Sequence, residues 1–416
     1  MKNRQAPQVL DRGALGKKGE RMLLNRIRAA QSMEKNGIDL LVATTPENVA
    51  YLTGFWILTS LRHRARQVYA VLKKGESKAD LVIGRGLIDH PLQGKTWVKA
   101  YYSYGEFFFA PEDQGGMDEE SKDLFRTLNG LKRYPDAFAA LTQCLRDNGG
   151  VRDRIGIDQA GDAVFLEKKL AKEFSNMETV PAYDLFREIR LIKTPEEVRR
   201  IEEATTIAEK ALAETLEAIR EGVTESRLDL VFKEAVIRQG GLPTLSCIGS
   251  GPRGAFPNVE PSERKIRKGD TIRFDVGCIY NAYHTDIART AVLGTPSAKQ
   301  KTLYEGLLSG QGRILESLKP GASIADLFQM GMQAARENGL PHYERHHLGH
   351  GTGIEGYDLP LLTPKNQLKL EAGMVFCVET PYYEPGFAGL QVEDIMEVTS
   401  IGARRLTRME RKLFIA

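Results

Sequence analysis

Two aspartates in the segment Thr271–Leu293, TIRFDVGCIYNAYHTDIARTAVL, are spaced so that a β-hairpin would bring them together. If the chain turns at Tyr280 and Asn281, Asp275 stands directly opposite Asp286. Like charges at opposed positions of an antiparallel pair, with Cβ atoms roughly 5 Å apart, are destabilising. The segment is rich in apolar residues, which indicates a buried hairpin, and an unpaired acid is costly there.

The repulsion between these two acids needs an offsetting interaction. A shared proton, a salt bridge to Arg273 or Arg289, or a metal ion could each supply it. The alternative is that both acids lie on a solvated strand face, where acidic residues are ordinary.

A second segment, Met374–Val398, repeats the arrangement with glutamates. Its turn signal is Glu384-Pro385-Gly386, and a turn centred on the glycine pairs Glu379 with Glu393. The sequence therefore predicts two hairpins, each carrying one opposed pair of acids.

Between the two hairpins lies the stretch HHLGHGTG, which holds His346, His347 and His350, three of the seven histidines of the chain. A single histidine is more often structural than a ligand, but three of them in one glycine-rich stretch between two acid pairs favour a site. Glycines would also let the backbone approach an ion or a substrate closely.

Two aspartates, two glutamates and one histidine suit two adjacent divalent ions. Four carboxylates balance four positive charges, whereas a single ion would leave buried negative charge. A site of mostly oxygen ligands with one nitrogen points to Mn²⁺, Co²⁺, Fe²⁺ or Zn²⁺, and less to Mg²⁺ or Ca²⁺.

The ordered set of these acids and His350, in the contexts FDVG, TDIART, GHGTG, VETPYY and VED, resembles the pita-bread metallopeptidase family, which includes methionine aminopeptidase, aminopeptidase P, prolidase and the metal-free creatinase. GIDLLVATTPENVAYLTGF, residues 37–55, is similar to the entry strand of the creatinase and prolidase N-terminal domain. The resemblance implies five metal ligands: Asp275, Asp286, His350, Glu379 and Glu393.

The resemblance also implies a mechanism. A hydroxide bridging two ions would attack a carbonyl that one of the ions polarises. Glu379 would be both a ligand and the group that passes a proton to the leaving amine. His346, four residues before His350, stands where the family has a substrate-binding histidine and would stabilise the oxyanion; His347 is interpreted as structural.

Three positions depart from the family pattern. Asn258 follows Pro257 where a histidine is common, and Tyr357 stands seven positions after His350, where the peptidases usually carry another histidine. Gln391 replaces the arginine of prolidase-like members, as in methionine aminopeptidases. We expect these three residues to bind substrate.

The resulting functional prediction is a dinuclear metal-dependent hydrolase, an Xaa-Pro dipeptidase or aminopeptidase P-type exopeptidase. The alternative is an enzyme of the same fold that cleaves a C–N or C–S bond in a small solute or a non-peptide amide, which the replacements at Asn258 and Tyr357 favour. A binding module without catalysis is disfavoured because it would not need five ligands.

The composition of the chain bears on its partners and its cellular location. The chain has 416 residues, and its net charge of +3 gives no reason to propose nucleic acid or a membrane surface as partner. Four cysteines without a CxxC pair predict reduced, buried thiols, and the absence of an early apolar run predicts a cytoplasmic protein.

The length predicts two domains. We expect a flexible, basic arm over residues 1–20, a creatinase-like or prolidase-like α/β domain over 21–185 and the catalytic pita-bread domain over 190–416, an α+β fold in which helices back a curved antiparallel sheet. Helices are predicted from Met22 to Asn36, from Thr194 to about Gly222, and over residues 226–239, 297–318 and 324–338, with a strand over residues 39–43.

Two further stretches carry predictions. The polar segment Ala110–Ser121 is expected to be a surface loop. His63, Arg64 and Arg66 could reach a carboxylate-bearing substrate across a dimer interface, although a solvated basic loop is the simpler interpretation. A homodimer is implied only by the family resemblance.

Overall fold

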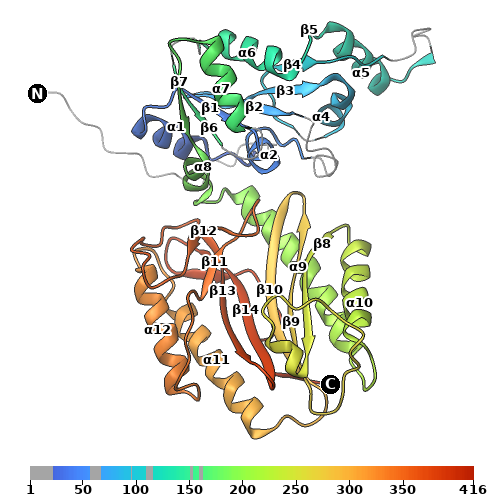
Figure 1. The fold of residues 1–416 in the computed structure, drawn as a ribbon, viewed down its shortest axis with the longest axis vertical. Coiled ribbons are helices and arrows are strands. Elements are labelled where there is room, and N and C mark those ends of the chain that lie inside the picture. Colours follow the sequence, from blue (N-terminus) through green and yellow to red (C-terminus); the bar gives the residue numbers. More distant parts are fainter. Residues whose placement is uncertain (1–21, 57–66, 95, 109–115, 150–152, 159–162) are drawn as a thin grey trace, which may run out of the picture.

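A computed structural model describes residues 22–416 except 57–66, 95, 109–115, 150–152 and 159–162. Two separate β-sheets, each covered by helices, divide the molecule into an N-terminal and a C-terminal domain, which are stacked along the long axis in Figure 1. The predicted arm over residues 1–20 and the predicted basic cluster of His63, Arg64 and Arg66 lie outside the described residues.

The N-terminal sheet has seven strands in the order β5-β4-β3-β2-β1-β6-β7. Strand β2 is antiparallel to β1 and β3, and the other neighbours are parallel. The strands are β1 (Leu40–Ala43), β2 (Tyr69–Lys73), β3 (Asp80–Gly84), β4 (Tyr101–Tyr104), β5 (Arg133–Tyr134), β6 (Arg154–Ile157) and β7 (Glu178–Pro181).

Helices cover both faces of this sheet because its strands are apolar on both faces. Leu40 and Val42 of β1 pack in the cluster that includes α6 and α7, and Leu41 and Ala43 pack in the cluster that includes α1 and α2. The helices are α1 (Arg26–Lys35), α2 (Pro46–Thr53), α4 (Asp89–Gln93), α5 (Glu119–Gly130), α6 (Ala137–Asp147), α7 (Ala163–Glu173) and α8 (Tyr183–Arg190), with the 3-10 turn η1 (Arg85–Leu87). The predicted surface loop over residues 110–121 is wrong from Glu119 onward, because α5 begins there. Residues 110–115 of that predicted loop lie outside the described residues.

The C-terminal domain opens with the helix predicted from its capping signal. Thr194 accepts a hydrogen bond from the backbone of Glu197, whose side chain accepts one from the backbone of Thr194, and Pro195 is the first helical residue. The helix is α9 (Pro195–Glu217), which ends before the predicted Gly222. The other predicted helices are confirmed as α10 (Glu225–Arg238), α11 (Ala298–Ser317) and α12 (Ile324–Glu337).

The nine-stranded C-terminal sheet has the order β12-β11-β13-β14-β10-β9-β8, with β15 on β14 and β16 on β10. Helices α9 and α10 pack against β8, β9 and β10, and α11 packs against β13 and β14 (Figure 1). The strands are β8 (Leu242–Ser250), β9 (Thr271–Tyr280), β10 (Tyr283–Val292), β11 (Gly349–Gly351), β12 (Asp358–Leu361), β13 (Val375–Glu384), β14 (Ala388–Val398), β15 (Ala403–Arg405) and β16 (Phe414–Ile415), with the 3-10 turn η3 (Gly251–Ala255) after β8.

The two predicted hairpins differ in how closely they match their predicted register. In β13 and β14, Glu379 pairs with Glu393 as predicted. In β9 and β10 the prediction is wrong: Asp275 pairs with Ala288, and Asp286 pairs with Gly277. The turn lies one residue later than expected. Since pairing then shifts by two positions, both aspartates remain on the same face of the sheet as diagonal neighbours.

A buried polar cluster joins the two domains. The guanidinium of Arg190, at the end of α8, donates to Asn48 Oδ1 at 2.6 Å, to Glu355 Oε1 at 2.6 Å and to Asp358 Oδ1 at 3.4 Å. Lys193 Nζ lies 3.5 Å from the other carboxylate oxygen of Asp358. Because Arg190 and Asp358 are both fully buried, this cluster fixes the start of β12 against the N-terminal domain.

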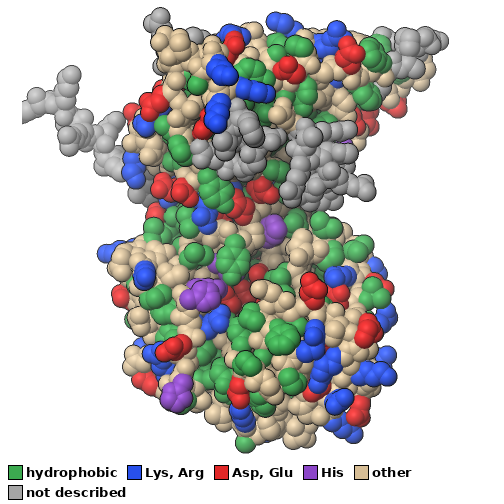
Figure 2. Space-filling model, in the orientation of Figure 1, with side chains coloured by type: hydrophobic (Ala, Val, Ile, Leu, Met, Phe, Trp, Pro, Cys, Tyr) green, Lys and Arg blue, Asp and Glu red, His purple; other side chains and the backbone are tan. Residues whose placement is uncertain are grey.

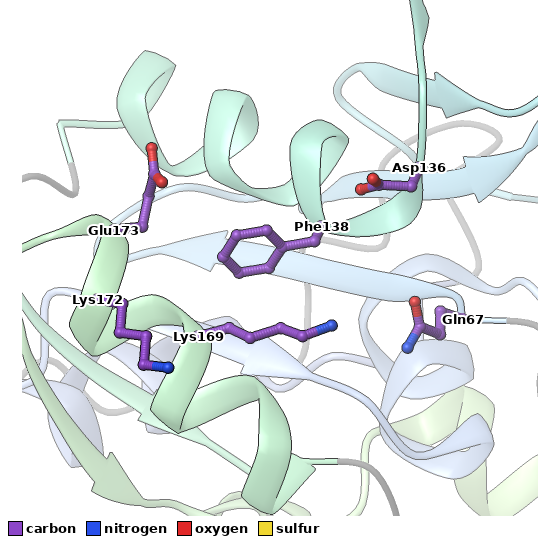
Figure 3. A pocket seen from close by; sticks show the side chains of 6 residues that line it. All are labelled: Gln67, Asp136, Phe138, Lys169, Lys172 and Glu173. Atoms are coloured by element: carbon purple, nitrogen blue, oxygen red, sulfur yellow. The ribbon is translucent and has the colours of Figure 1, made fainter.

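Three further observations complete the fold. No helix in the described part of the chain is long and apolar enough to cross a membrane. All four cysteines are free thiols, as predicted, but Cys247 is only half-buried, so the prediction that all four are buried is wrong there. A hollow of about 490 Å³ in the N-terminal domain is lined by Gln67, Asp136, Phe138, Lys169, Lys172 and Glu173 (Figure 3). Its lining comes from the domain that lacks the predicted metal ligands, so it is distinct from the candidate site.

Candidate active site

The alternation of side chains along β9 determines what faces the site. Ile272, Phe274 and Val276 belong to the apolar core that includes α9 and α10. Successive strand residues point to opposite faces, so Arg273 and Asp275 point to the face that the helices leave open. The same alternation applies to the facing strands, and the sheet therefore collects acidic side chains on one side.

Three acids and one histidine converge on that face. Asp275, Asp286 and Glu393 each place a carboxylate oxygen within 4.8 Å of the others. His350 Nε2 lies 3.8 Å from Asp286 Oδ2 and 3.9 Å from Glu393 Oε1. Glu379 faces Glu393 across the hairpin. Histidine and acidic side chains gather on the C-terminal domain near the waist of the molecule in Figure 2.

Without a cation this cluster carries strong internal repulsion. Burial, together with the neighbouring carboxylates, raises the pKa of Asp286 and of Glu393 well above the ordinary range. Burial also raises the pKa of Asp275, although Arg273 opposes it. For Glu379 burial acts in the same direction, but His347 and His350 outweigh it and its pKa is lowered.

The donor atoms fit divalent metal ions. Asp286 Oδ1 and Glu393 Oε1 are both buried and have no hydrogen-bond partner among the described residues. A buried carboxylate oxygen left without a donor is costly. His350 Nδ1 lies 2.9 Å from the carbonyl oxygen of Gly351, which leaves Nε2 turned toward the acids. An ion between these atoms would supply the missing partner.

Gln391 is at the centre of the hydrogen-bond network that orders the acids. Its Nε2 donates to Glu379 Oε2 at 3.3 Å and to Glu393 Oε2 at 3.2 Å, and its Oε1 accepts from Arg273 Nη1 at 2.9 Å. The same Nη1 of Arg273 lies 2.9 Å from Asp275 Oδ2. Gln391 thus lies beside the two glutamates on the same face of the sheet, where it can orient two predicted ligand carboxylates.

The two arginines considered from the sequence have different partners. Arg273 forms the salt bridge to Asp275, one of the three predicted ways to offset the repulsion. Arg289 instead pairs with Asp394 Oδ1 at 2.8 Å and donates to the carbonyl of Glu393 at 2.6 Å. Since Arg289 and Asp394 are both fully buried, this second pair fixes the backbone that carries Glu393.

The histidine stretch places two rings at the edge of the acid cluster. His347 Nδ1 lies 3.1 Å from Glu379 Oε1, so this residue, interpreted from sequence as structural, touches a predicted ligand. His346 is exposed, and its ring meets that of His347 edge-on at 4.3 Å between centroids. The predicted contribution of His346 to oxyanion stabilisation stays a prediction.

The three departures from the family pattern occupy different places. The ring of Tyr357 stacks on that of His350, while its residue remains 55% exposed. Gln391 is buried among the acids. Asn258 is exposed on the loop that Arg273 fixes through hydrogen bonds to the carbonyls of Phe256 and Pro257, both 2.8 Å.

Sequence reasoning missed one residue of the cluster. Cys377 offers its Sγ within 4.8 Å of donor atoms of His350 and Glu393, and burial raises the pKa of its thiol well above the usual range. The signal was available, because Cys377 precedes Glu379 by two residues on the same strand and therefore shares its face.

The glycines of the histidine stretch serve strand packing. A Cβ on Gly349 would lie 2.0 Å from the carbonyl oxygen of Cys377, and one on Gly351 would lie 2.0 Å from that of Leu359. Both contacts are to the neighbouring strands β13 and β12. The sequence predicted that these glycines let the backbone approach an ion or a substrate. At these two positions they instead let neighbouring strands approach one another.

The chain is similar to known proteins in both sequence and fold. A model of metallopeptidase family M24 matches residues 199–400, which include the five predicted ligands. The Xaa-Pro dipeptidase of Pyrococcus furiosus is 36% identical over 253 residues, which are 60% of this chain and 71% of that protein. The chain belongs to metallopeptidase family M24. A second relative, the Xaa-Pro dipeptidase of Pyrococcus horikoshii, is 34% identical over 309 residues, 73% of this chain and 84% of the relative.

Solved structures agree with the M24 assignment. The prolidase from Pyrococcus horikoshii has a TM-score of 0.73 and 27% identity, covering 94% of this chain and 99% of that one. The Xaa-Pro dipeptidase from Bacillus anthracis has a TM-score of 0.77 at 24% identity over 94% and 99% of the two chains, and it shows the shared fold. The predicted two-domain pita-bread architecture and peptidase-type hydrolase class are confirmed, and family M24 implies divalent metal ions.

Proposed function

We propose that this chain is a metal-dependent Xaa-Pro dipeptidase whose site lies on the open face of the C-terminal sheet. The observation that carries the proposal is the convergence of Asp275, Asp286 and Glu393, where Asp286 and Glu393 each have a buried oxygen atom with no hydrogen-bond partner among the described residues. Relatives named Xaa-Pro dipeptidase, at 34% and 36% identity, support the choice of substrate class.

The chain's residues are suited to hold two divalent ions. The five ligands would be Asp275, Asp286, His350, Glu379 and Glu393, whose four carboxylates balance two divalent charges. Oxygen donors with a single imidazole favour Mn²⁺, Co²⁺, Fe²⁺ or Zn²⁺. When bound, such ions polarise a carbonyl and lower the pKa of water.

Glu379 is the residue placed to move the proton. Its lowered pKa keeps it ionised near neutral pH, so it can accept a proton from the attacking water and deliver it to the leaving amine. His347 and Gln391 contact its two oxygen atoms and hold its orientation. His346, which is exposed, would stabilise the oxyanion formed from the substrate carbonyl, and Asn258 and Tyr357 would contact the rest of the substrate.

Hydrolysis by metal-stripped and reloaded protein tests this function. We expect metal-dependent release of proline from Ala-Pro, and little release of amino acids from Ala-Ala or Met-Ala-Ser. Asp275→Asn should lower metal content and activity together, while Glu379→Gln should retain part of the metal and lose turnover. Asp326→Asn, at an exposed position on α12, is the matched control.

One alternative outcome has a defined meaning. Metal binding without turnover of any peptide would support cleavage of a C–N or C–S bond in a small solute, the reaction that the departures at Asn258 and Tyr357 favour. The M24 relatives named above do not favour it. We further propose a cytoplasmic homodimer, which light scattering of the purified protein and cell fractionation would test.

A further inference from the structure

A second group of metal donors overlaps one end of the acid cluster and includes a thiol. A ring nitrogen of His350, Cys377 Sγ and a carboxylate oxygen of Glu393 all lie within 4.8 Å of one another, and all three residues are buried. His350 on β11 pairs directly with Cys377 on β13. Glu393 on β14 pairs with Glu379, two residues after Cys377, so Glu393 is a diagonal neighbour of Cys377 on the same face. Three separate strands therefore bring three types of donor together.

All three donors have an atom that can bind a cation. Glu393 Oε1 is buried without a hydrogen-bond partner among the described residues, because Gln391 donates to the other oxygen, Oε2. His350 Nδ1 lies 2.9 Å from the carbonyl oxygen of Gly351, which leaves Nε2 for an ion. Cys377 Sγ lies 3.8 Å from the carbonyl oxygen of Asp286, and this weak contact uses the thiol proton and not the sulfur lone pairs.

The charge of this group suits one divalent ion. When the metal–sulfur bond forms, the thiol of Cys377 loses its proton to solvent and becomes a thiolate. One thiolate and one carboxylate balance the two charges of a single ion, and the imidazole is neutral. Cys377 and its strand partner Ile395 belong to the apolar core, which favours a neutral complex. A thiolate added to the four carboxylates of the dinuclear set would instead exceed the charge of two ions.

We propose that His350, Cys377 and Glu393 form a separate site for one thiophilic divalent ion, such as Zn²⁺, and that its occupation excludes the dinuclear metal pair. Thiolate and imidazole donors select a thiophilic ion, whereas carboxylate donors suit Mn²⁺. Because His350 and Glu393 are also predicted ligands of the pair, the two occupancies compete. An excess of a thiophilic ion therefore leaves the dinuclear site incomplete and, where the proposed dipeptidase function holds, inactivates the enzyme.

Titration of the metal-stripped full chain with Cd²⁺ tests this site. A Cd²⁺–thiolate bond gives an ultraviolet charge-transfer absorption that oxygen and nitrogen ligands do not give. Wild type should show this absorption and saturate it with one ion per chain. Cys377→Ser should abolish the absorption and weaken Cd²⁺ binding at least roughly tenfold, since even a lost partner of a ligand costs about 10- to 100-fold in metal affinity. Its Mn²⁺ affinity should be unchanged, because Mn²⁺ prefers oxygen donors.

Cys247→Ser is the matched control, because it removes another thiol beside the acids. Cys247 on β8 pairs directly with Asp275, so its side chain shares the face of the acid cluster, and it is half-buried. In the sheet order, β8 lies on the other side of β9, β10 and β14 from β13. Cys247→Ser should therefore keep the wild-type absorption and Cd²⁺ affinity.

Three results would overturn the proposal. The first is an unchanged absorption in Cys377→Ser, and the second is loss of the absorption in Cys247→Ser. The third concerns competition: added Mn²⁺ should weaken apparent Cd²⁺ binding to wild type, and binding of Cd²⁺ to the thiol together with two Mn²⁺ ions would contradict the exclusion. If Cys377→Ser does not fold, Cys377→Ala removes the sulfur without burying a hydroxyl and should give the same results. None of these measurements uses a peptide, so their failure is distinct from failure of the dipeptidase function.

Discussion

The ring of Tyr357 lies face to face with the ring of His350, with centroids 3.6 Å apart and planes 16° from parallel. His350 is buried and predicted to hold metal, whereas Tyr357 is mostly exposed. A residue that departs from the family pattern therefore covers the imidazole ligand. Tyr357 has two possible effects: it restricts the orientation of His350, and it forms part of the wall that a substrate would meet.

Removing the Tyr357 ring should weaken metal binding. Aromatic pairs contribute about 0.5–1.5 kcal/mol beyond burial, so Tyr357→Ala should lower metal affinity roughly two- to tenfold. Tyr357→Phe keeps the ring and should retain the wild-type affinity. Competition with a chromophoric chelator measures both variants, and equal affinities for the Ala and Phe variants would show that the stacked ring does not support His350.

Replacing Gln391 by leucine should destabilise the acid cluster. The substitution removes the two hydrogen bonds that Gln391 donates to Glu379 and Glu393 and the one that it accepts from Arg273. All of these hydrogen bonds are buried. We expect the free energy of unfolding of the metal-free protein to fall by about 1–3 kcal/mol, measured by urea titration. Gln391→Glu keeps an acceptor for Arg273 but adds a third buried negative charge beside the two glutamates. It should raise the pH needed for metal binding, and an unchanged pH dependence would contradict this account.

Asp358 should matter for stability through the cluster that joins the domains. Asp358→Asn leaves buried Arg190 and Lys193 without their shared counter-ion, and breaking such a pair costs about 3–5 kcal/mol. Burial opposes ionisation of Asp358, but Lys193 and Arg190 outweigh it and lower its pKa. The contribution is therefore present above the ordinary aspartate pKa of about 4 and is lost as pH falls through the lowered value.

Urea unfolding at pH 7 and in acid tests this expectation. The difference between wild type and Asp358→Asn should be largest at neutral pH and should shrink below about pH 4. A constant difference across that range would mean that the ionised carboxylate is not the stabilising group.

Metal binding should release protons. Because the pKa values of Asp286 and Glu393 are raised well above the usual range, the metal-free protein holds protons that an ion must displace. Apparent metal affinity should therefore rise as pH rises. The number of protons released per bound ion should fall as pH rises, because fewer of the acids are then protonated. Calorimetry at pH 6 and pH 8, in two buffers with different protonation enthalpies, measures that number. Metal binding without proton release at either pH would contradict the raised pKa values.

The same groups give a stability effect of the opposite sign to that of Asp358. An acid whose pKa is raised on folding binds more protons in the native state than in the unfolded state. Stability of the metal-free protein should therefore fall as pH rises from the ordinary carboxyl pKa of about 4 through the raised values. Bound metal should remove this slope, because it replaces the protons.

The turns explain which parts of the site could be predicted from sequence. Gly386 adopts a left-handed backbone conformation, with φ of 83°, as its type indicates, and the Glu379–Glu393 register was predicted correctly. In the first hairpin the left-handed residues are Asn281 and Ala282, with φ of 48° and 70°. Alanine gives no signal for such a turn, so the predicted turn was one residue early.

Other features depended on tertiary packing and had no local signal. The α9 start was predictable because Thr194, Pro195 and Glu197 act within one helical turn. The stacking of Tyr357 on His350 joins two side chains seven residues apart, and no local sequence pattern relates them. Sequence periodicity predicts the face of a strand but not which distant side chains meet there.

A metal titration of stripped protein tests the central claim most directly. Mn²⁺ or Co²⁺ is added stepwise, and bound ions per chain and proline release from Ala-Pro are measured on the same samples. The account predicts no turnover without metal, and full turnover only when two ions are bound. Asp286→Asn should bind fewer ions and lose turnover in proportion. Full proline release with no bound metal would contradict the assignment of these residues as a dinuclear metal site. Bound ions and proline release in Asp286→Asn equal to those of wild type would contradict it as well.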